Sequence, residues 1–127
     1  MGTIKSYKDL IVWQKSIQLV KEIFLLTESY PKSELYGIIS QMRRAAVSIP
    51  SNIAEAYGRR STPGTSQFYS FAYGSALELE TQIIISKELG LASEKAFMRS
   101  EDLLLEILKM LNKITGNFKN QTLVTNI

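Results

Sequence analysis

The stretch QMRRAAVSIPSNIAEAYGRR, residues 41–60, decides the fold of this chain. At 100° per residue, its polar side chains fall in a stripe about 80° wide, directly beside an apolar face. The stripe consists of Arg44, Ser48, Asn52, Glu55 and Arg59, with Gln41 at its start. Hydroxyl and amide side chains alternate there with charges, whereas a solvated face usually carries long, interchangeable charges. We therefore expect a second helix to cover the stripe, as in an interaction scaffold.

A matching set of polar residues lies in the region expected to form the third helix. Ser75, Glu78 and Gln82 are embedded there among apolar residues. We expect Glu78 to meet Arg44 in a buried pair, with hydroxyl and amide groups hydrogen-bonded nearby. The predicted structural polar network consists of Gln41, Arg44, Ser48, Asn52, Glu55, Ser75, Glu78 and Gln82.

Composition limits the chemistry that this chain can perform. Its 127 residues, 45% of them hydrophobic and 21% charged, suit one domain with a real core. Neither cysteine nor histidine is present, which removes the commonest acid–base residue and the commonest metal ligands. The sequence therefore predicts no enzymatic activity, no metal, no cofactor and no small-molecule substrate. The net charge of +3 permits an anionic partner without requiring one.

The sequence contains no targeting or membrane-spanning signal. The N-terminal MGTIKSYKDL lacks an apolar core, and no apolar run long enough to cross a bilayer follows it. We expect a cytoplasmic protein with no membrane partner.

Apolar periodicity predicts four amphipathic helices. The first opens at Ser6, where Asp9 completes a capping box, and it ends before Pro31. Its predicted seam is Leu10, Trp13, Ile17, Val20 and Phe24. Ser33 is expected to cap the second helix, whose inward seam is Leu35, Ile38, Met42, Ala45, Ile49 and Ile53.

Pro50 leaves two alternatives for the second helix. It removes the backbone hydrogen bond to Ala46 and costs about 3 kcal/mol inside a helix. Either the helix continues with a kink near Pro50, which keeps the polar stripe in phase, or it stops near Ser48 and restarts at Asn52. The spacing from Asn52 to Glu55 imitates a capping box, which supports the second alternative. We favour the kinked, continuous helix.

The remaining boundaries follow from turn residues. They place a loop at 59–65 and a third helix over 66–89, with Gly90 as its C-terminal cap. Ser93 caps the fourth helix, which is expected to fray by Phe118 and leave a flexible C-terminal tail. Short connections between four helices predict an all-α, up-and-down four-helix bundle. It forms a single domain, residues 1–127, with an ordered core over about 6–118.

Two apolar triplets predict that the bundle self-associates. Ile83–Ile85 and Leu103–Leu105 each span about 200° of a helix. One core cannot cover both sides of a helix, so neighbouring copies should bury part of this surface.

Basic residues are the other functional candidates. Arg43, Arg59 and Arg60, with Lys32 and Lys87 as weaker additions, could contact phosphates if an assembly repeats them. The leading hypothesis is a non-enzymatic, oligomeric scaffold that binds RNA, DNA or a nucleic-acid-handling protein. The alternative is a purely structural homo-oligomer with protein partners only. They differ in whether the arginines of several subunits converge on one surface or are neutralised by carboxylates inside the bundle.

Four motifs resemble the four helix bundle protein family, also called the 23S rRNA intervening-sequence protein family. They are LIVWQ at 10–14, PxxExYG at 31–37, QxRRAxxSIPSNIAE at 41–55 and GSxxELETQ at 74–82. Together they are specific, although each alone is weak. Ala56 departs from the pattern, because the family usually has glycine at this position.

The resemblance implies a four-helix bundle that assembles into a ring, typically a pentamer. Members are encoded in bacterial genomes, within inserts of large-subunit rRNA genes or elsewhere, and their biochemical role is largely unassigned. The family's fold is similar to that of the accessory proteins of diversity-generating retroelements, which work with a reverse transcriptase and nucleic acid. That similarity is an analogy at the level of the fold.

Overall fold

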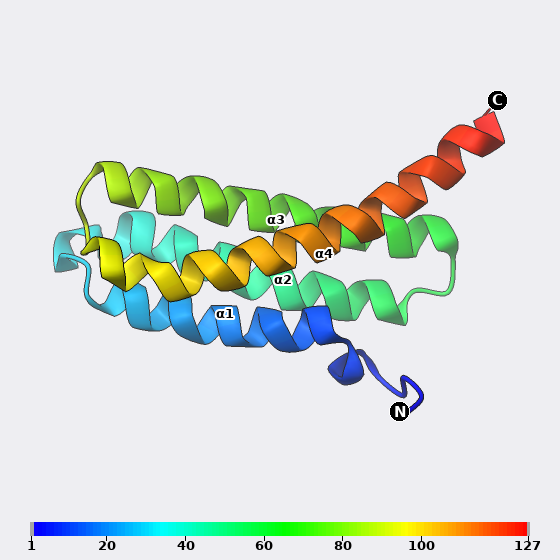
Figure 1. The fold of residues 1–127 in the computed structure, drawn as a ribbon, viewed down its shortest axis with the longest axis horizontal. Coiled ribbons are helices and arrows are strands. Elements are labelled where there is room, and N and C mark those ends of the chain that lie inside the picture. The colour runs from blue at the N-terminus through cyan, green and yellow to red at the C-terminus, as the bar shows by residue number, and fades with distance from the viewer. Residues whose placement is uncertain (1, 127) are drawn as a thin grey trace.

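The computed structural model describes the backbone of residues 2–126 and the side chains of residues 2–118. Its described part is all-helical, without a strand, as the sequence predicts. Each helix runs antiparallel to the one before it, and α1 and α3 each pack against both α2 and α4 (Figure 1). The four α-helices are α1 (Ile11–Glu28), α2 (Ser40–Gly58), α3 (Thr62–Glu88) and α4 (Glu94–Asn126).

The capping box at the N-terminus is formed, but it caps a short turn rather than α1. The Ser6 side chain accepts a hydrogen bond from the backbone of Lys8 (3.0 Å), and the Asp9 carboxylate accepts one from the backbone of Ser6 (3.2 Å). These bonds close the 3₁₀ turn η1 (Tyr7–Asp9), after which Leu10 is extended and α1 begins at Ile11. The predicted start at Ser6 is therefore wrong by five residues.

The buried face of α1 also differs from the predicted seam. Ile17 and Phe24 are 43% and 39% exposed. The apolar arc of this helix is wider than one seam, so periodicity alone could not decide which part faces α2 and α4. The buried residues are Val12, Ser16, Leu19, Ile23, Leu26 and Thr27.

The chain between α1 and α2 is helical but irregular. A 3₁₀ turn, η2 (Lys32–Glu34), leads into a π-helical turn, η3 (Leu35–Ile39). Gly37 has non-helical dihedral angles (φ −111°, ψ −113°), so regular α geometry begins only at Ser40. No side chain caps η2, η3 or α2, and the prediction that Ser33 does so is wrong.

Helix α2 passes through Pro50 without a break, so the alternative that restarts at Asn52 is wrong. Two side chains bond to carbonyls next to the bond that proline removes. Ser51 donates to the carbonyl of Val47 (2.9 Å), and Asn52 Nδ2 donates to the carbonyl of Ser48 (2.8 Å). The acceptors are the two carbonyls that follow Ala46, whose own backbone donor is the one that Pro50 removes. The kink at Pro50 stays a prediction.

Helix α3 begins at Thr62, four residues before the predicted start. Ser61 is the N-cap, because its hydroxyl accepts a hydrogen bond from the backbone of Gly64 (3.1 Å). Pro63 lies in the first turn, where its missing N–H costs nothing. Residues 62–65 of the predicted loop therefore form the first turn of α3, whereas residues 59–61 lie between the helices as predicted.

The end of α3 and the start of α4 follow the prediction. Gly90 is left-handed (φ 65°), and the backbone of Leu91 donates to the carbonyl of Ser86 (3.0 Å), which completes a Schellman motif. Ser93 accepts from the backbone of Ala96 (3.3 Å) at the start of α4. The helical backbone continues past Phe118 to Asn126, and fraying from Phe118 onward stays a prediction. The side chains of 119–127 lie outside the described residues.

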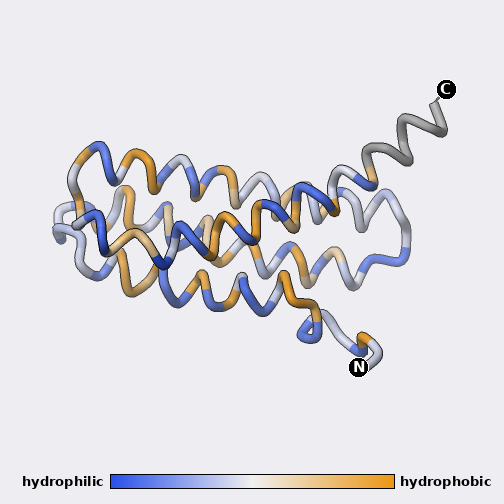
Figure 2. The backbone as a smooth tube through the Cα atoms, in the orientation of Figure 1, coloured by the Kyte–Doolittle hydropathy of each residue, from blue (hydrophilic) through white to orange (hydrophobic). Residues whose placement is uncertain are grey.

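The core lies on the axis of the bundle and draws on all four helices. Figure 2 shows apolar residues recurring along every helix. Burying one large aliphatic side chain is worth about 1.5–3 kcal/mol, so these contacts dominate the stability. Fully buried large side chains are Leu19, Ile23, Met42, Ile49, Ile53, Leu79, Phe97, Ile107 and Leu111.

Candidate interaction surfaces

Helices α2 and α3 are joined by part of the predicted polar network. The hydroxyls of Ser48 and Ser75 lie 2.8 Å apart across the two helices. Asn52 Nδ2 also donates to Ser48 Oγ (2.9 Å), so three residues form one connected set. These side chains are partly buried, so the bonds tie the two helices together.

Arg44 and Glu78 do not form the buried pair that the sequence predicts. Both are exposed, and no hydrogen bond or ion pair joins them among the residues with described side chains. They line the same groove between α2 and α3, which has a volume of ≈ 380 Å³ and includes Ser48 and Ser75. The pair fails because the groove is open to solvent, where neither charge needs a partner.

Three further members of the network lie apart from one another. Glu55 is exposed and pairs with Arg59 one turn along α2 (2.6 Å), so the prediction that it belongs to an inter-helix network is wrong. Gln82 is buried and donates to Glu78 (3.2 Å), whereas its own Oε1 has no partner. Gln41 is exposed at the rim of the α2/α3 groove.

Arg43 holds α1 against α2. Its guanidinium lies 4.6 Å from the ring centre of Phe24 and donates to the hydroxyl of Thr27 (2.9 Å). It also donates to the carbonyl of Phe24 (3.4 Å). The side chain is half-buried, so it is not the freely accessible phosphate ligand that the sequence suggests. Phe24 and Thr27 are neutral, however, so these contacts do not neutralise the charge of Arg43.

Arg59 and Lys87 have carboxylate partners within the chain. Arg59 stacks over the ring of Phe68 (4.2 Å) in addition to its pair with Glu55. Lys87 bridges α3 to α4 by contacting Glu101 (3.1 Å) and Glu94 (3.5 Å). The hydrogen bond that Lys87 donates to Glu101 is the main reason that the pKa of Lys87 is raised.

The remaining basic candidates lie at opposite ends of the bundle. Arg60 follows α2, whereas Lys32 lies in η2, at the end where α3 also finishes (Figure 1). Both are exposed, and neither has a side-chain partner in the described part of the chain. One chain therefore does not gather the five predicted basic residues on a single surface.

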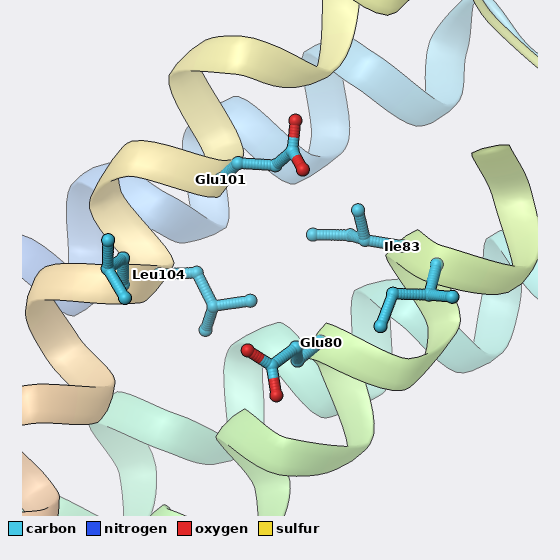
Figure 3. Close-up of a pocket in the computed structure, with 6 residues that line it drawn as sticks. Glu80, Ile83, Glu101 and Leu104 are labelled. Atoms are coloured by element: carbon cyan, nitrogen blue, oxygen red, sulfur yellow. The ribbon is translucent and has the colours of Figure 1, made fainter.

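The side of the bundle formed by α3 and α4 carries a pocket of ≈ 250 Å³, which we name the acidic groove. In Figure 3, Ile83 and Leu104 point toward each other between two glutamates. The apolar triplets of the sequence indicate this surface, but nothing in the pattern singles out Glu80. The lining residues are Glu80, Ile83, Ile84, Glu101, Leu104 and Leu105.

A second apolar hollow of ≈ 360 Å³ lies on the side formed by α1 and α2, and we name it the basic groove. It combines exposed apolar side chains with two arginines. The sequence singles out both arginines, but it does not place them beside exposed apolar residues. The lining residues are Phe24, Arg43, Arg44, Val47 and Ser48.

Comparison with known proteins matches residues 8–113 to a family model described as 23S rRNA-intervening sequence protein. The chain belongs to this family. The match to the 23S rRNA-intervening sequence proteins covers α1, α2, α3 and most of the described part of α4, and so includes both grooves. A search of curated proteins found no match. The family description names no activity, so function has to be argued from the surfaces.

Two further features concern membranes and metal ions. Within residues 2–126, no helix combines the length and apolarity needed to cross a bilayer. In the same part of the chain, acidic side chains do not gather in threes in a way that could hold a metal ion.

Proposed function

We propose that this chain is the subunit of a non-enzymatic, homo-oligomeric helical scaffold that acts in the cytoplasm. The observation that carries the proposal is the exposure of large apolar side chains on both outer sides of the bundle. Ile84 and Leu105 are 55% and 52% exposed in the acidic groove, and Val47 is 44% exposed in the basic groove. Apolar surface of this kind, when clustered, marks an interaction site.

A ring, typically a pentamer, is the assembly implied by the sequence resemblance, and a closed ring would cover both apolar sides of every subunit. Catalysis has little support in the polar groove. The Ser48 and Ser75 hydroxyls contact each other and Asn52. A serine nucleophile needs an adjacent base, and none of these groups is one.

Thermal unfolding at several protein concentrations tests the self-association. If folding is coupled to assembly, mass action raises the melting temperature as the concentration rises from 1 to 100 µM. A melting temperature that stays constant over this range, with the protein fully folded, would contradict the proposal.

Nucleic-acid binding is the second candidate, and the free guanidinium of Arg60 is the observation that favours it. In a ring, every subunit places this residue at the same end, so the assembly repeats a charge that one chain presents once. RNA, DNA or a nucleic-acid-handling protein could bind there. The alternative, a scaffold with protein partners only, is favoured by the carboxylates that occupy Arg59 and Lys87.

A titration with fluorescent single-stranded RNA and duplex DNA separates these alternatives. We expect binding at 50 mM salt that weakens steeply by 200 mM, because counterion release loses its advantage. Arg60→Glu should weaken it further, whereas Lys95→Glu, exposed at the start of α4, should not. Absence of binding by the wild type at 50 mM salt would leave the protein-only scaffold as the better account.

A further inference from the structure

The acidic and basic grooves lie on opposite sides of the bundle. Helix α1 neighbours α2 and α4, and α3 neighbours the same two helices, so the α1/α2 side faces away from the α3/α4 side. Each groove is apolar at its centre, and the two carry charges of opposite sign. If the chain self-associates as proposed above, these two surfaces are the natural partners for each other.

The acidic groove carries negative charge that the chain does not neutralise. Glu80 is exposed and has no basic partner among the described residues. Glu101 shares Lys87 with Glu94, so two carboxylates divide one ammonium group between them. A neighbour that covers Ile84 and Leu105 therefore needs apolar side chains flanked by positive charge.

The basic groove meets this requirement. Arg44 makes no hydrogen bond or ion pair within residues 2–118, and Arg43 contacts the neutral side chains of Phe24 and Thr27. Glu78 shares the α2/α3 groove with Arg44 but accepts a hydrogen bond from Gln82 instead. Phe24 and Val47 supply exposed apolar surface beside the arginines. The groove thus offers two positive charges next to apolar side chains.

Both grooves also lie at the same level along the bundle. Ser86 contacts Met42 (3.5 Å) and Ser75 contacts Ser48 (2.8 Å), which fixes the alignment of α3 against α2. Arg44 lies between Met42 and Ser48 on α2, so it is level with the part of α3 between residues 75 and 86. That part contains Glu80 and Ile84. A contact between grooves at equal levels needs no shift along the bundle axis.

We propose that the acidic groove of one subunit receives the basic groove of the next. Phe24 and Val47 would cover Ile84 and Leu105, and Arg44 would meet Glu80. Such a contact is heterologous, because each subunit uses a different surface toward each neighbour. Without an axial shift, a heterologous contact closes into a ring when the rotation from one subunit to the next divides a full turn.

Charge reversal, read by light scattering, tests the pairing. Glu80→Arg and Arg44→Glu should each raise the dissociation constant of the assembly by about tenfold or more, because like charges then face each other. The double variant Glu80→Arg/Arg44→Glu should restore assembly, because the charges are exchanged. Glu106→Arg, at an exposed residue that contacts Lys15 on the α1/α4 side, and Lys8→Glu, at an exposed residue in η1, are matched controls that should assemble as the wild type does.

The outcomes separate this inference from the proposed function on which it rests. A monomeric wild type would overturn the scaffold itself. An oligomeric wild type with unaffected single variants, or a folded double variant that stays dissociated, would overturn the pairing alone. All four reversed side chains are exposed, and circular dichroism checks that each variant folds. If a reversal variant unfolds, Glu80→Gln and Arg44→Gln replace it, and unchanged assembly in both would equally overturn the pairing.

Discussion

The buried hydroxyl of Tyr30 is a weak point of the core at the scale of single residues. The side chain packs near the ring of Phe97 (6.4 Å between ring centres), and its hydroxyl has no hydrogen-bond partner among the described residues. Burial raises the pKa of Tyr30 above its ordinary value of 10.0, and the neighbouring Ser86 offsets part of that rise. The folded protein therefore holds this proton more tightly than the unfolded chain does.

Tyr30→Phe should leave stability unchanged or raise it at neutral pH, because a buried group without a partner is removed. The neutral form of Tyr30 contributes to the free energy of unfolding. This contribution is present below about pH 10 and is lost as the pH rises through the raised pKa. The variant should therefore lose less stability between pH 8 and pH 11 in urea unfolding. Tyr36→Phe, at a side chain that is 95% exposed, controls for the loss of a hydroxyl. The same loss in wild type and Tyr30→Phe would show that folding does not raise the pKa of Tyr30, and would contradict the prediction.

At the scale of the helix, replacing either of two glycines by alanine should change stability, but in opposite directions. One glycine lies inside α3 and the other just after its C-terminal end. Gly90 has a φ of 65° in the Schellman motif, so Gly90→Ala should cost about 1–2 kcal/mol. Gly74 lies in the middle of α3 with nothing within 4 Å of an added Cβ, so Gly74→Ala should stabilise by about 0.5–1 kcal/mol. Denaturant unfolding measures both. Destabilisation by Gly74→Ala would place a neighbouring subunit against this face.

The sequence predicts some features of the helices well, because short-range chemistry decides them. The Gly90 terminus and the Ser93 cap depend on residues within one turn of each other, and both are confirmed. The seam of α1 depends on which neighbours pack against a wide apolar arc, and there the prediction is wrong at Ile17 and Phe24, whereas the other three residues of the seam pack against the core. The prediction that Pro63 lies in a loop is also wrong, because a proline suits both a loop and the first turn of a helix.

The candidate site shows the same division between local and long-range information. Periodicity correctly placed Ser48, Asn52 and Ser75 in one polar contact between α2 and α3. It could not show that the surrounding groove is open, which decides whether Arg44 and Glu78 must pair. Nor could it place Glu80 beside apolar residues of α4, because that juxtaposition depends on the alignment of two antiparallel helices.

At the scale of the whole molecule, the bundle leaves apolar surface on two opposite sides. The inner faces of the four helices fill one core, yet Ile84, Leu105 and Val47 remain outside it. A surface of this kind favours association in water over an isolated subunit. The central claim is therefore that the functional unit is an assembly of several copies rather than one chain.

The molar mass of the wild-type protein in solution tests that claim most directly. Multi-angle light scattering during size-exclusion chromatography, at micromolar concentration and moderate salt, reports it without reference to shape. We expect a single species at an integer multiple of 14.3 kDa, and a multiple greater than two if the ring closes as proposed. A folded species at 14.3 kDa would contradict the claim and leave the two grooves as sites for other partners.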